Sequence, residues 1–531
     1  MSDERDVAGD LATDGGTATD ADPVGIETAA IRLPAFRLSS EEIADAWGTS
    51  HAPGVERKAV AGADEDALTM AVAAAERVLA GGDEGAAEAT TTVVDPGRID
   101  LVVTATTTPP MEEGEFTPRL VRALGLPTDV ATATVRGSTA AGGEALARGL
   151  EAARSGTTLV VVSDSPAGDP AETDHPMGAG AAAFVLSADP AVEVGEPAWH
   201  VEEYPGIRHR ERGAETVDTL DITTYQRTAI RESITAATEA LADDGGPLEA
   251  SGLEAVDAAA VHQPNGSLPY RATGDLPLDP GTVQAGTVAD RIGDAGAATV
   301  PIGLLAAVAA EAGEADDDPS DEGGPEDRRS VATFFGGGTA VSMACQGTLS
   351  VDGIDELGGG EPITYDDYLR KRGTIVDGAV AGGGAHVSLP NWQGSLDQRY
   401  RLVAGRCPEC GGVTFPPTGA CRECHERVTF EEFEAPRTGT VRAVTVIGQG
   451  GAPPEFTGHQ QRDGAYGVAI VDLGEGDDEI TLPGQLTDAD PTAVEVGETV
   501  VATVRRIYEQ EGVPRYGVKF VPTDAESTDA E

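Results

Sequence analysis

The chain has 531 residues, with 91 Asp and Glu against 36 Lys and Arg, which gives a formal net charge of −55. The length predicts two or three domains, and the negative charge argues against broad binding to nucleic acid or to anionic membranes. Because the acid is spread along the whole chain and would repel itself in ordinary salt, the composition predicts a protein of a halophilic archaeon that folds in molar salt, where the Debye length is about 3 Å.

Residues 1–24 are polar and acidic, and we expect them to form a disordered tail. They lack the basic and apolar segments of a signal peptide, and the chain has no run of about 18 apolar residues. Four of the five cysteines are grouped, unlike a secreted disulfide framework. These features predict a cytoplasmic protein with no membrane span.

Residues 25–350 alternate short apolar segments with alanine-rich segments, which predicts an α/β domain. We expect strands at 101–104, 159–163, 182–186, 258–261, 333–335 and 340–343, and helices at 66–79, 142–153, 223–241 and 301–312. The first helix follows Asp64, Glu65 and Asp66, which are acids suited to a helix N-terminus. Residues 313–329 predict a surface loop inside this domain.

The rest of the chain predicts smaller units. Residues 351–400 form a connector with a helix at 363–372, and residues 401–435 hold the grouped cysteines. Residues 436–522 contain alternating strands between Gly and Asp turns, which predicts a small all-β barrel of the OB type. Residues 523–531 form a second acidic tail.

The grouped cysteines are Cys407, Cys410, Cys421 and Cys424. Two CxxC pairs place four thiolates around a tetrahedral zinc ion at about 2.3 Å, and two disulfides or four free thiols are the alternatives. Since the protein fills all four positions, we expect a structural zinc, to which the adjacent His425 is surplus. A ribbon followed by a barrel can bind nucleic acid, but residues 400–531 hold 11 basic and 23 acidic residues, which argues against that function.

Further motifs surround the two cysteine pairs: Arg399-Tyr400-Arg401-Leu402, Phe415-Pro416-Pro417 and Gly439-Thr440-Val441. With the cysteines, they resemble a family of zinc-ribbon and OB-fold proteins associated with acyl-CoA. The resemblance covers about residues 390–522. It implies that the barrel helps to hold a CoA moiety or bridges two enzymes, and that a thiolase-fold protein is a partner.

The N-terminal domain has motifs of its own: Asp64 to Val72, Gly142 to Leu146, His262-Gln263-Pro264-Asn265-Gly266, Gly293 to Leu304, and Phe335-Gly336-Gly337-Gly338. They resemble segments of the 3-hydroxy-3-methylglutaryl-CoA (HMG-CoA) synthases. The resemblance covers about residues 25–350. It implies a thiolase-like fold of two similar halves, a CoA thioester as ligand and a homodimer.

The resemblance also locates the catalytic residues, most of which are replaced. The position of the nucleophilic cysteine falls on Thr139, beside Ser138, and no cysteine lies between Met1 and Ala344. Acyl transfer from a thioester needs such a nucleophile, and a threonine hydroxyl is a poor one without a strong adjacent base. For Thr139 a helix N-cap is therefore the preferred interpretation.

The position of the general-base glutamate is taken by Thr106 or Thr107, and the asparagine of the later glycine segment is Asp294. Of the catalytic Cys, Glu and His, only His262 remains. Other carboxylates lie shortly downstream, at Glu112, Glu113 and Glu115. The sequence therefore keeps the imidazole of this chemistry but neither its thiol nor its base.

Two other features have a structural and a functional interpretation. Arg208, Arg210 and Arg212 are either ordinary surface arginines or a patch for the CoA phosphates. Cys345 follows the glycine loop, and we expect it to be a small core residue.

Three hypotheses follow. The first is an acyl-CoA-binding protein without cysteine chemistry that partners a thiolase or synthase. The second is an active acyl-CoA condensing or transferring enzyme that uses His262 and a non-standard nucleophile. The third, which the charge of the barrel disfavours, is a zinc-ribbon protein that binds nucleic acid.

Overall fold

The computed structural model describes residues 23–79, 93–220, 223–242, 246–248, 251–309, 327–375, 388–448, 454–474 and 476–523. Residues 1–22 and 524–531 of the two predicted acidic tails and residues 313–326 of the predicted loop lie outside the described residues. Within the described part of the chain, no helix combines the length and the apolar character that crossing a bilayer requires.

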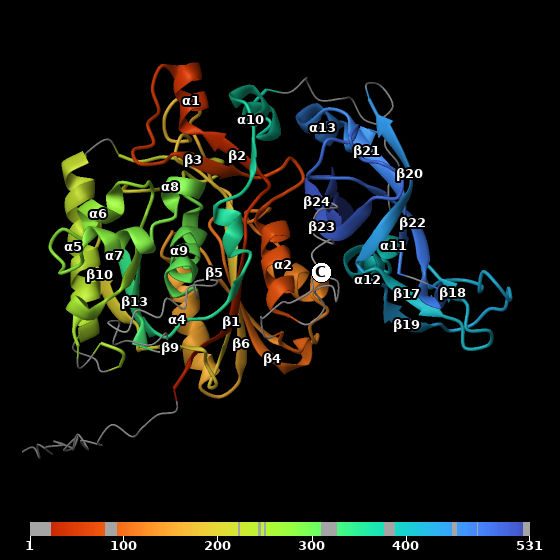
Figure 1. Cartoon of the computed structure of the whole chain (residues 1–531), viewed down its shortest axis with the longest axis horizontal. Helices are drawn as coiled ribbons and strands as arrows, with labels where there is room; N and C mark the ends of the chain where they lie inside the picture. The colour runs from red at the N-terminus through yellow and green to blue at the C-terminus, as the bar shows by residue number, and fades with distance from the viewer. Residues whose placement is uncertain are drawn as a thin grey trace, which may run out of the picture.

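A mixed eleven-stranded sheet forms the centre of the N-terminal part (Figure 1). Its main path has the order β12-β13-β14-β9-β1-β8-β6-β4-β5, while β10 pairs with β14 and β15 with β1. The strands are β1 (Gly25–Arg32), β4 (Ile99–Ala105), β5 (Ala131–Val135), β6 (Thr157–Asp164), β8 (Gly180–Ser187), β9 (Val192–Val194), β10 (Ala198–Val201), β12 (Ala258–Val261), β13 (Arg329–Gly336), β14 (Thr339–Gln346) and β15 (Val351–Asp352). All six predicted strands are confirmed, and the other five strands of the sheet, β1, β5, β9, β10 and β15, were not predicted.

Helices cover both faces of the sheet, because its central strands are apolar on both faces. Alternate residues of β1, β6 and β8 face the core of α4 (Ala141–Ala153) and α9 (Thr299–Val308), and the others face the core of α2 (Ala67–Val78). A third core lies between α5 (Thr223–Glu239) and strands β12 to β14. The four predicted helices are confirmed, and Asp66 is the N-cap of α2 in a capping box with Thr69.

Short elements complete this part. They are β2 (Phe36–Ser39), α1 (Ser40–Trp47), β3 (Arg57–Val60), α3 (Thr117–Ala123), β7 (Ala167–Gly168), β11 (Thr216–Val217), α6 (Leu268–Ala272), α7 (Pro280–Ala285), α8 (Ala289–Ile292) and β16 (Glu361–Pro362). The predicted connector helix is α10 (Tyr365–Lys371), and α11 (Leu389–Gln393) and α12 (Leu396–Arg401) follow it.

The C-terminal part contains two small sheets. Strands β17 (Val403–Arg406), β18 (Val413–Thr414) and β19 (Glu431–Glu434) carry the cysteine loops. The second sheet has the order β22-β21-β20-β23-β24, and a bridge between Leu486 and Phe520 nearly closes it into a barrel. Its elements are β20 (Thr438–Ile447), α13 (Pro454–Asp463), β21 (Tyr466–Leu473), β22 (Ile480–Gln485), β23 (Thr499–Gln510) and β24 (Val513–Pro522). The predicted small all-β barrel is therefore present.

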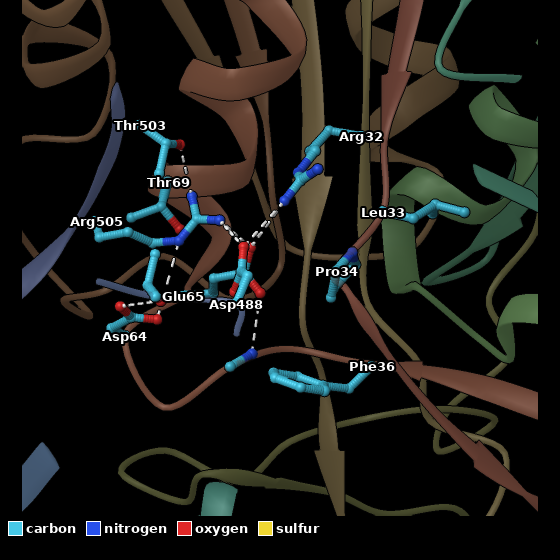
Figure 2. Close-up of polar contacts among 12 residues, drawn as sticks. Arg32, Leu33, Pro34, Phe36, Asp64, Glu65, Thr69, Asp488, Thr503 and Arg505 are labelled. Carbon is cyan, nitrogen blue, oxygen red and sulfur yellow. Dashed lines mark hydrogen bonds and ion pairs between the residues drawn. The ribbon is translucent and has the colours of Figure 1, made fainter. Parts of the chain in front are cut away.

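The barrel lies against α2 and shares its core, since Val504 and Tyr516 are buried in the same apolar cluster as that helix (Figure 1). A buried set of charges joins the two parts, and Figure 2 shows Arg505 of β23 beside carboxylates of the loop before α2. The Nη2 atom of Arg505 lies 3.1 Å from Glu65 and 2.7 Å from Asp488. This ion network, as we call it below, contains Arg32, Arg505, Lys519, Asp64, Glu65 and Asp488. Each of these three carboxylates lies against a cation, as a buried cluster of charges requires, and Arg32 also lies 3.4 Å from Glu356.

Candidate functional site

The predicted site residues gather where parallel strands end. Strand β4 is parallel to β6, and β12 is parallel to β13, so the carboxyl ends of each pair lie together. Thr106 follows β4, Asp164 ends β6 and His262 follows β12. Loops after the strands of an open sheet are a common place for ligand binding, because they can be varied without disturbing the core.

Thr139 lies just before α4 and is buried. Its hydroxyl donates a hydrogen bond of 2.6 Å to the carbonyl oxygen of Phe335. The prediction that Thr139 caps α4 is wrong, because the N-cap is Ala140 and no side chain caps this end. A Cβ at Gly336 would lie 2.5 Å from the Thr139 hydroxyl, so the glycine loop after β13 packs directly on it.

His262 lies beside the same loop. Its ring meets the ring of Phe335 edge-on at 5.5 Å between centroids, and its backbone N–H donates to Thr333. Burial lowers the pKa of His262 to about 4, with Asp294 opposing the shift and Arg208 adding to it. A buried imidazole with this pKa is neutral at pH 7. It can therefore accept a hydrogen bond at one ring nitrogen and donate one from the other, for example to a thioester oxygen.

Asp294 and Arg208 form an ion pair next to His262. The Asp294 side chain is buried and also accepts a 2.9 Å hydrogen bond from the backbone N–H of Gly296. The structure therefore places Asp294 close enough to His262 for its charge to act on the imidazole. Asp294 stands where an asparagine was expected. Because a buried carboxylate requires a cation, Arg208 from a distant loop balances its charge.

The three loop arginines differ in their contacts. Arg208 is committed to Asp294, and Arg210 donates to the carbonyl oxygen of Thr107. Arg212 is exposed. Two members of the cluster thus bind residues of the site, and the CoA-phosphate interpretation of the cluster stays a prediction.

The sequence did not identify Asp164. Its carboxylate accepts hydrogen bonds of 2.7 to 2.9 Å from the hydroxyls of residues 106–108, from the backbone N–H groups of residues 107 and 108, and from the N–H of Ala297. The side chain is fully buried, so it holds the threonine loop and the loop after Asp294 in one place. Its position at the carboxyl end of a predicted strand was the available signal.

The other candidates lie away from this centre. Glu112, Glu113 and Glu115 are exposed, and Glu115 faces Arg119 at 3.7 Å. Cys345 is buried in the main core, and burial raises the pKa of its thiol to about 12. The prediction that Cys345 is a core residue is confirmed. Neither the three glutamates nor Cys345 supplies a nucleophile or a base to this centre.

The four grouped cysteines bring their sulfur atoms within 4.8 Å of one another. The Sγ atoms of Cys407 and Cys424 are 3.8 Å apart, and those of Cys410 and Cys421 are 3.6 Å apart. A tetrahedron with metal–sulfur bonds of about 2.3 Å has edges of about 3.8 Å, so the residues fit zinc. Among the described residues this is the one such group of possible ligands.

The two cysteine loops have the same backbone pattern. Cys407 donates to Gly412, and Gly411 donates back to Cys407. In the second loop Cys421 donates to Glu426, and His425 donates back to Cys421. His425 therefore takes the place that Gly411 has in the first loop, and both have a positive φ. His425 is therefore explained as a turn residue, and a site made of four cysteines does not need it as a ligand.

Comparisons with known proteins support both parts of this description. Residues 396–431 match the family described as ChsH2, rubredoxin-like zinc ribbon domain. The chain is 35% identical over 131 residues to a DUF35 domain-containing scaffold protein of Methanocaldococcus jannaschii, which covers 24% of this chain and 86% of that protein. It is 27% identical over 326 residues to the hydroxymethylglutaryl-CoA synthase of Pyrobaculum neutrophilum, which covers 59% of this chain and 84% of that protein.

Among solved structures, an HMG-CoA synthase complexed with CoA matches with a TM-score of 0.55 and 15% identity, over 69% of this chain and 94% of that one. This likeness establishes the fold. The predicted fold class, a thiolase-like α/β domain followed by a zinc ribbon and a small β-barrel, is confirmed.

Proposed function

We propose a function from the premise that this chain belongs, through its C-terminal part, to the family of DUF35 domain-containing proteins. We infer that its HMG-CoA synthase-like domain binds an acyl-CoA thioester. We also infer that this domain lacks the cysteine chemistry of the HMG-CoA synthases. The observation that carries the proposal is the hydrogen bond from Thr139 to Phe335. A hydroxyl that donates to a backbone carbonyl is held away from a base and is not activated as a nucleophile.

The surroundings of Thr139 support this proposal. Asp164 accepts hydrogen bonds from the threonine loop and Asp294 is paired with Arg208, so both buried carboxylates already have partners. General-base catalysis raises the rate of such a reaction about 10²- to 10⁴-fold. The loss of the base together with the thiol therefore removes most of the rate enhancement of a condensing enzyme. The retained His262 can still donate a hydrogen bond to a thioester oxygen.

The alternative is an active condensing or transferring enzyme. The observation that favours it is the neutral imidazole of His262, which contacts the same Phe335 that binds Thr139. Incubation with radiolabelled acetyl-CoA, followed by denaturation and peptide mapping, separates the two functions. We expect acyl-CoA binding without a covalent adduct, and label only in the Thr139→Cys variant. Label on Thr139 or Ser138 of the natural chain, lost in their alanine variants, would establish the enzyme instead.

We further propose that the C-terminal part acts as a scaffold toward a thiolase or synthase. Its relatives are named scaffold proteins, and its ion network holds the barrel on the α/β domain of the same chain. A pull-down in molar salt from the natural host tests this. Recovery of an acyl-CoA enzyme is the expected result, whereas recovery of nucleic-acid enzymes alone would contradict it.

A homodimer is also proposed, through the edge strand β5. This strand pairs only with β4 in the described sheet, carries no charge and has three exposed residues, Ala131, Thr132 and Thr134. Exposed edges are normally protected by charge or proline, because they can pair with another chain. In a chain this acidic, an uncharged edge is consistent with pairing to a second copy.

The remaining proposals concern environment and metal. We propose that the protein works in molar salt in the cytoplasm of a halophilic archaeon, since its charge of −55 needs screening. We also propose that the four cysteines hold zinc as a structural ion, which would stabilise loops that contain few apolar residues.

A further inference from the structure

A buried lysine lies beside the segment that carries Asp294. Lys58 is on β3 and only 1% exposed, and its Nζ atom donates to the backbone oxygen of Asp174 at 2.7 Å and to its carboxylate at 3.2 Å. Tyr368 of α10 completes the group, since its hydroxyl accepts a 2.9 Å hydrogen bond from Lys58 and donates to the Asp174 carboxylate. Helix α10 packs here on β2 and β3 (Figure 1). We call Lys58, Asp174 and Tyr368 the lysine triad.

Burying the lysine triad has a cost in free energy. Burial lowers the pKa of Lys58 to about 8, while Asp174 opposes the shift. Replacing a buried ion pair by apolar residues of similar volume is often neutral or stabilising. The stability of the fold alone therefore does not account for the triad, and its contacts indicate another role.

The triad holds the backbone on one side of Asp294. Asp174 begins a turn, in which its carbonyl oxygen accepts a 3.0 Å hydrogen bond from Met177. The residues of this turn bracket Asp294: its N–H donates to the carbonyl oxygen of Pro176 at 2.6 Å, and its carbonyl oxygen accepts from the N–H of Gly178 at 2.9 Å. The place of Asp294 therefore depends on the turn that the triad anchors.

Lys58 also contacts the same segment directly. Its stem packs on Gly293, where an added Cβ would lie 2.9 Å from the Cβ of Lys58. Gly293 has a φ of +74°, so its conformation as well as its size favours glycine. The next residue, Asp294, pairs with Arg208, and both charges act on His262. A path of contacts therefore runs from Lys58 to the ion pair beside the imidazole.

A further contact joins the same helix to the other loop of the site. Arg372, directly after α10, donates to the carbonyl oxygen of Pro166 at 2.9 Å and to the hydroxyl of Ser165 at 3.3 Å. Ser165 follows Asp164, which holds the threonine loop. The connector helix thus supports both loops of the candidate site, although it lies outside the central sheet.

We propose that the lysine triad positions Asp294 and keeps the ring of His262 buried. Its members are positioning residues: they act on a bound thioester only through the backbone that flanks Asp294. A preorganised site binds its ligand more tightly, because less ordering has to accompany binding. The role concerns the ligand-free protein, and it rests on the proposed acyl-CoA function only for the change in affinity expected below.

Tyr368→Phe tests the proposal, because it removes one hydroxyl and keeps the ring in its core. Hydrogen exchange of the full chain in molar KCl should become about tenfold faster in peptides covering residues 174–178 and 289–298, while β6 and β8 stay protected. Nitrogen-15 signals of labelled histidine at about pH 5.5 should show His262 neutral in the natural chain and partly protonated in the variant. The reason is that water reaching the ring raises its pKa from about 4 toward 6.5. Acetyl-CoA binding by calorimetry should weaken about tenfold.

The matched control is Tyr365→Phe, one turn earlier on α10. The hydroxyl of Tyr365 bonds to Trp47 and Pro170, so its loss should leave all three measurements unchanged. Equal changes in this control would show a general loosening of α10 and overturn the proposal. Faster exchange throughout β6 and β8 would also overturn it, and so would unchanged exchange and protonation in Tyr368→Phe.

A second variant, Lys58→Met with Asp174→Asn, separates positioning from stability. It removes both charges together, so no carboxylate is left buried without its lysine. We expect a denaturant midpoint close to that of the natural chain, with the same local exchange and protonation changes as in Tyr368→Phe. A stable double variant with a fully protected Asp294 segment would contradict the role of the triad. If the natural chain binds no acetyl-CoA, the proposed function fails, whereas exchange and protonation still decide the role of the triad.

Discussion

The guanidinium of Arg505 lies 3.1 Å from the carboxylate of Glu65, and neither side chain is exposed to solvent. The two residues are 440 positions apart, one on barrel strand β23 and one in the loop before α2. Isolated charges of this kind are costly to bury, so the pair exists only because Arg32, Asp64 and Asp488 complete the network around it. The network therefore fixes one orientation of the barrel on the α/β domain.

Replacing Arg505 should separate the two parts. In Arg505→Met, three carboxylates lose a buried partner, and breaking such a pair typically costs about 3–5 kcal/mol. Limited proteolysis and thermal unfolding in molar KCl should show a separate, earlier transition of the barrel. Arg442→Met, at an exposed position of the same barrel, should leave one transition. A single unchanged transition in Arg505→Met would contradict the role of the network.

The zinc prediction is quantitative. The protein should contain one zinc per chain, and Cys407→Ser or Cys421→Ser should release it and unfold the ribbon, because structural zinc contributes on the order of 10 kcal/mol. Metal analysis and circular dichroism measure the two effects. Cys345→Ser, in the core of the other domain, is the matched control and should keep the zinc. Reduced cysteines without metal in the natural protein would end this proposal.

Stability should depend on the protonation of His262. Its folded pKa of about 4 lies below the usual 6.5, so the unfolded chain binds more protons between these values and stability rises with pH there. The contribution of the neutral His262 to the stability of the folded protein is complete above pH 6.5 and is lost as the pH falls through 4. A pKa shift of this size corresponds to about 3 kcal/mol in the free energy of unfolding. Denaturant unfolding against pH should show a shallower acid slope in His262→Gln. His200→Gln, on β10, should keep the full slope.

The pairing of Arg208 with Asp294 predicts a rescue. Arg208→Met should destabilise the protein by about 3–5 kcal/mol, because it leaves the carboxylate of Asp294 buried without a cation. Adding Asp294→Asn removes the buried charge and should recover most of the loss, which a double-mutant cycle measures. Additive losses in the double variant would mean that the two side chains do not depend on each other.

The proposed dimer is tested at β5. Lysine at Thr132 should prevent pairing of two edge strands and give a monomer by light scattering, since charge on an edge blocks strand addition. Thr440→Lys, on an exposed position of β20, should not change the mass. A natural chain that is monomeric in molar salt at working concentration would contradict the proposal.

Much of the candidate site could be predicted because it depends on local sequence. His262 and Asp294 were located through contiguous motifs, and the cysteines through their spacing. Six strands of the sheet were equally visible as short apolar runs, whereas five were not, among them β5, with its alternating Ala and Thr. Thr139 was predicted to cap the helix that follows it, but its hydroxyl donates to the carbonyl oxygen of Phe335 across the fold.

The sequence by itself determined the grouping of the four cysteines, the apolar strands and the excess of acid, because each is a property of neighbouring residues. Only the tertiary structure decided which of the many charges are paired and buried. Arg208 had no partner until the fold placed it on Asp294, and Asp164 had no interpretation until residues 106–108 surrounded it. The physical reason is that burying a charge depends on partners hundreds of residues away, and only the folded chain brings these together.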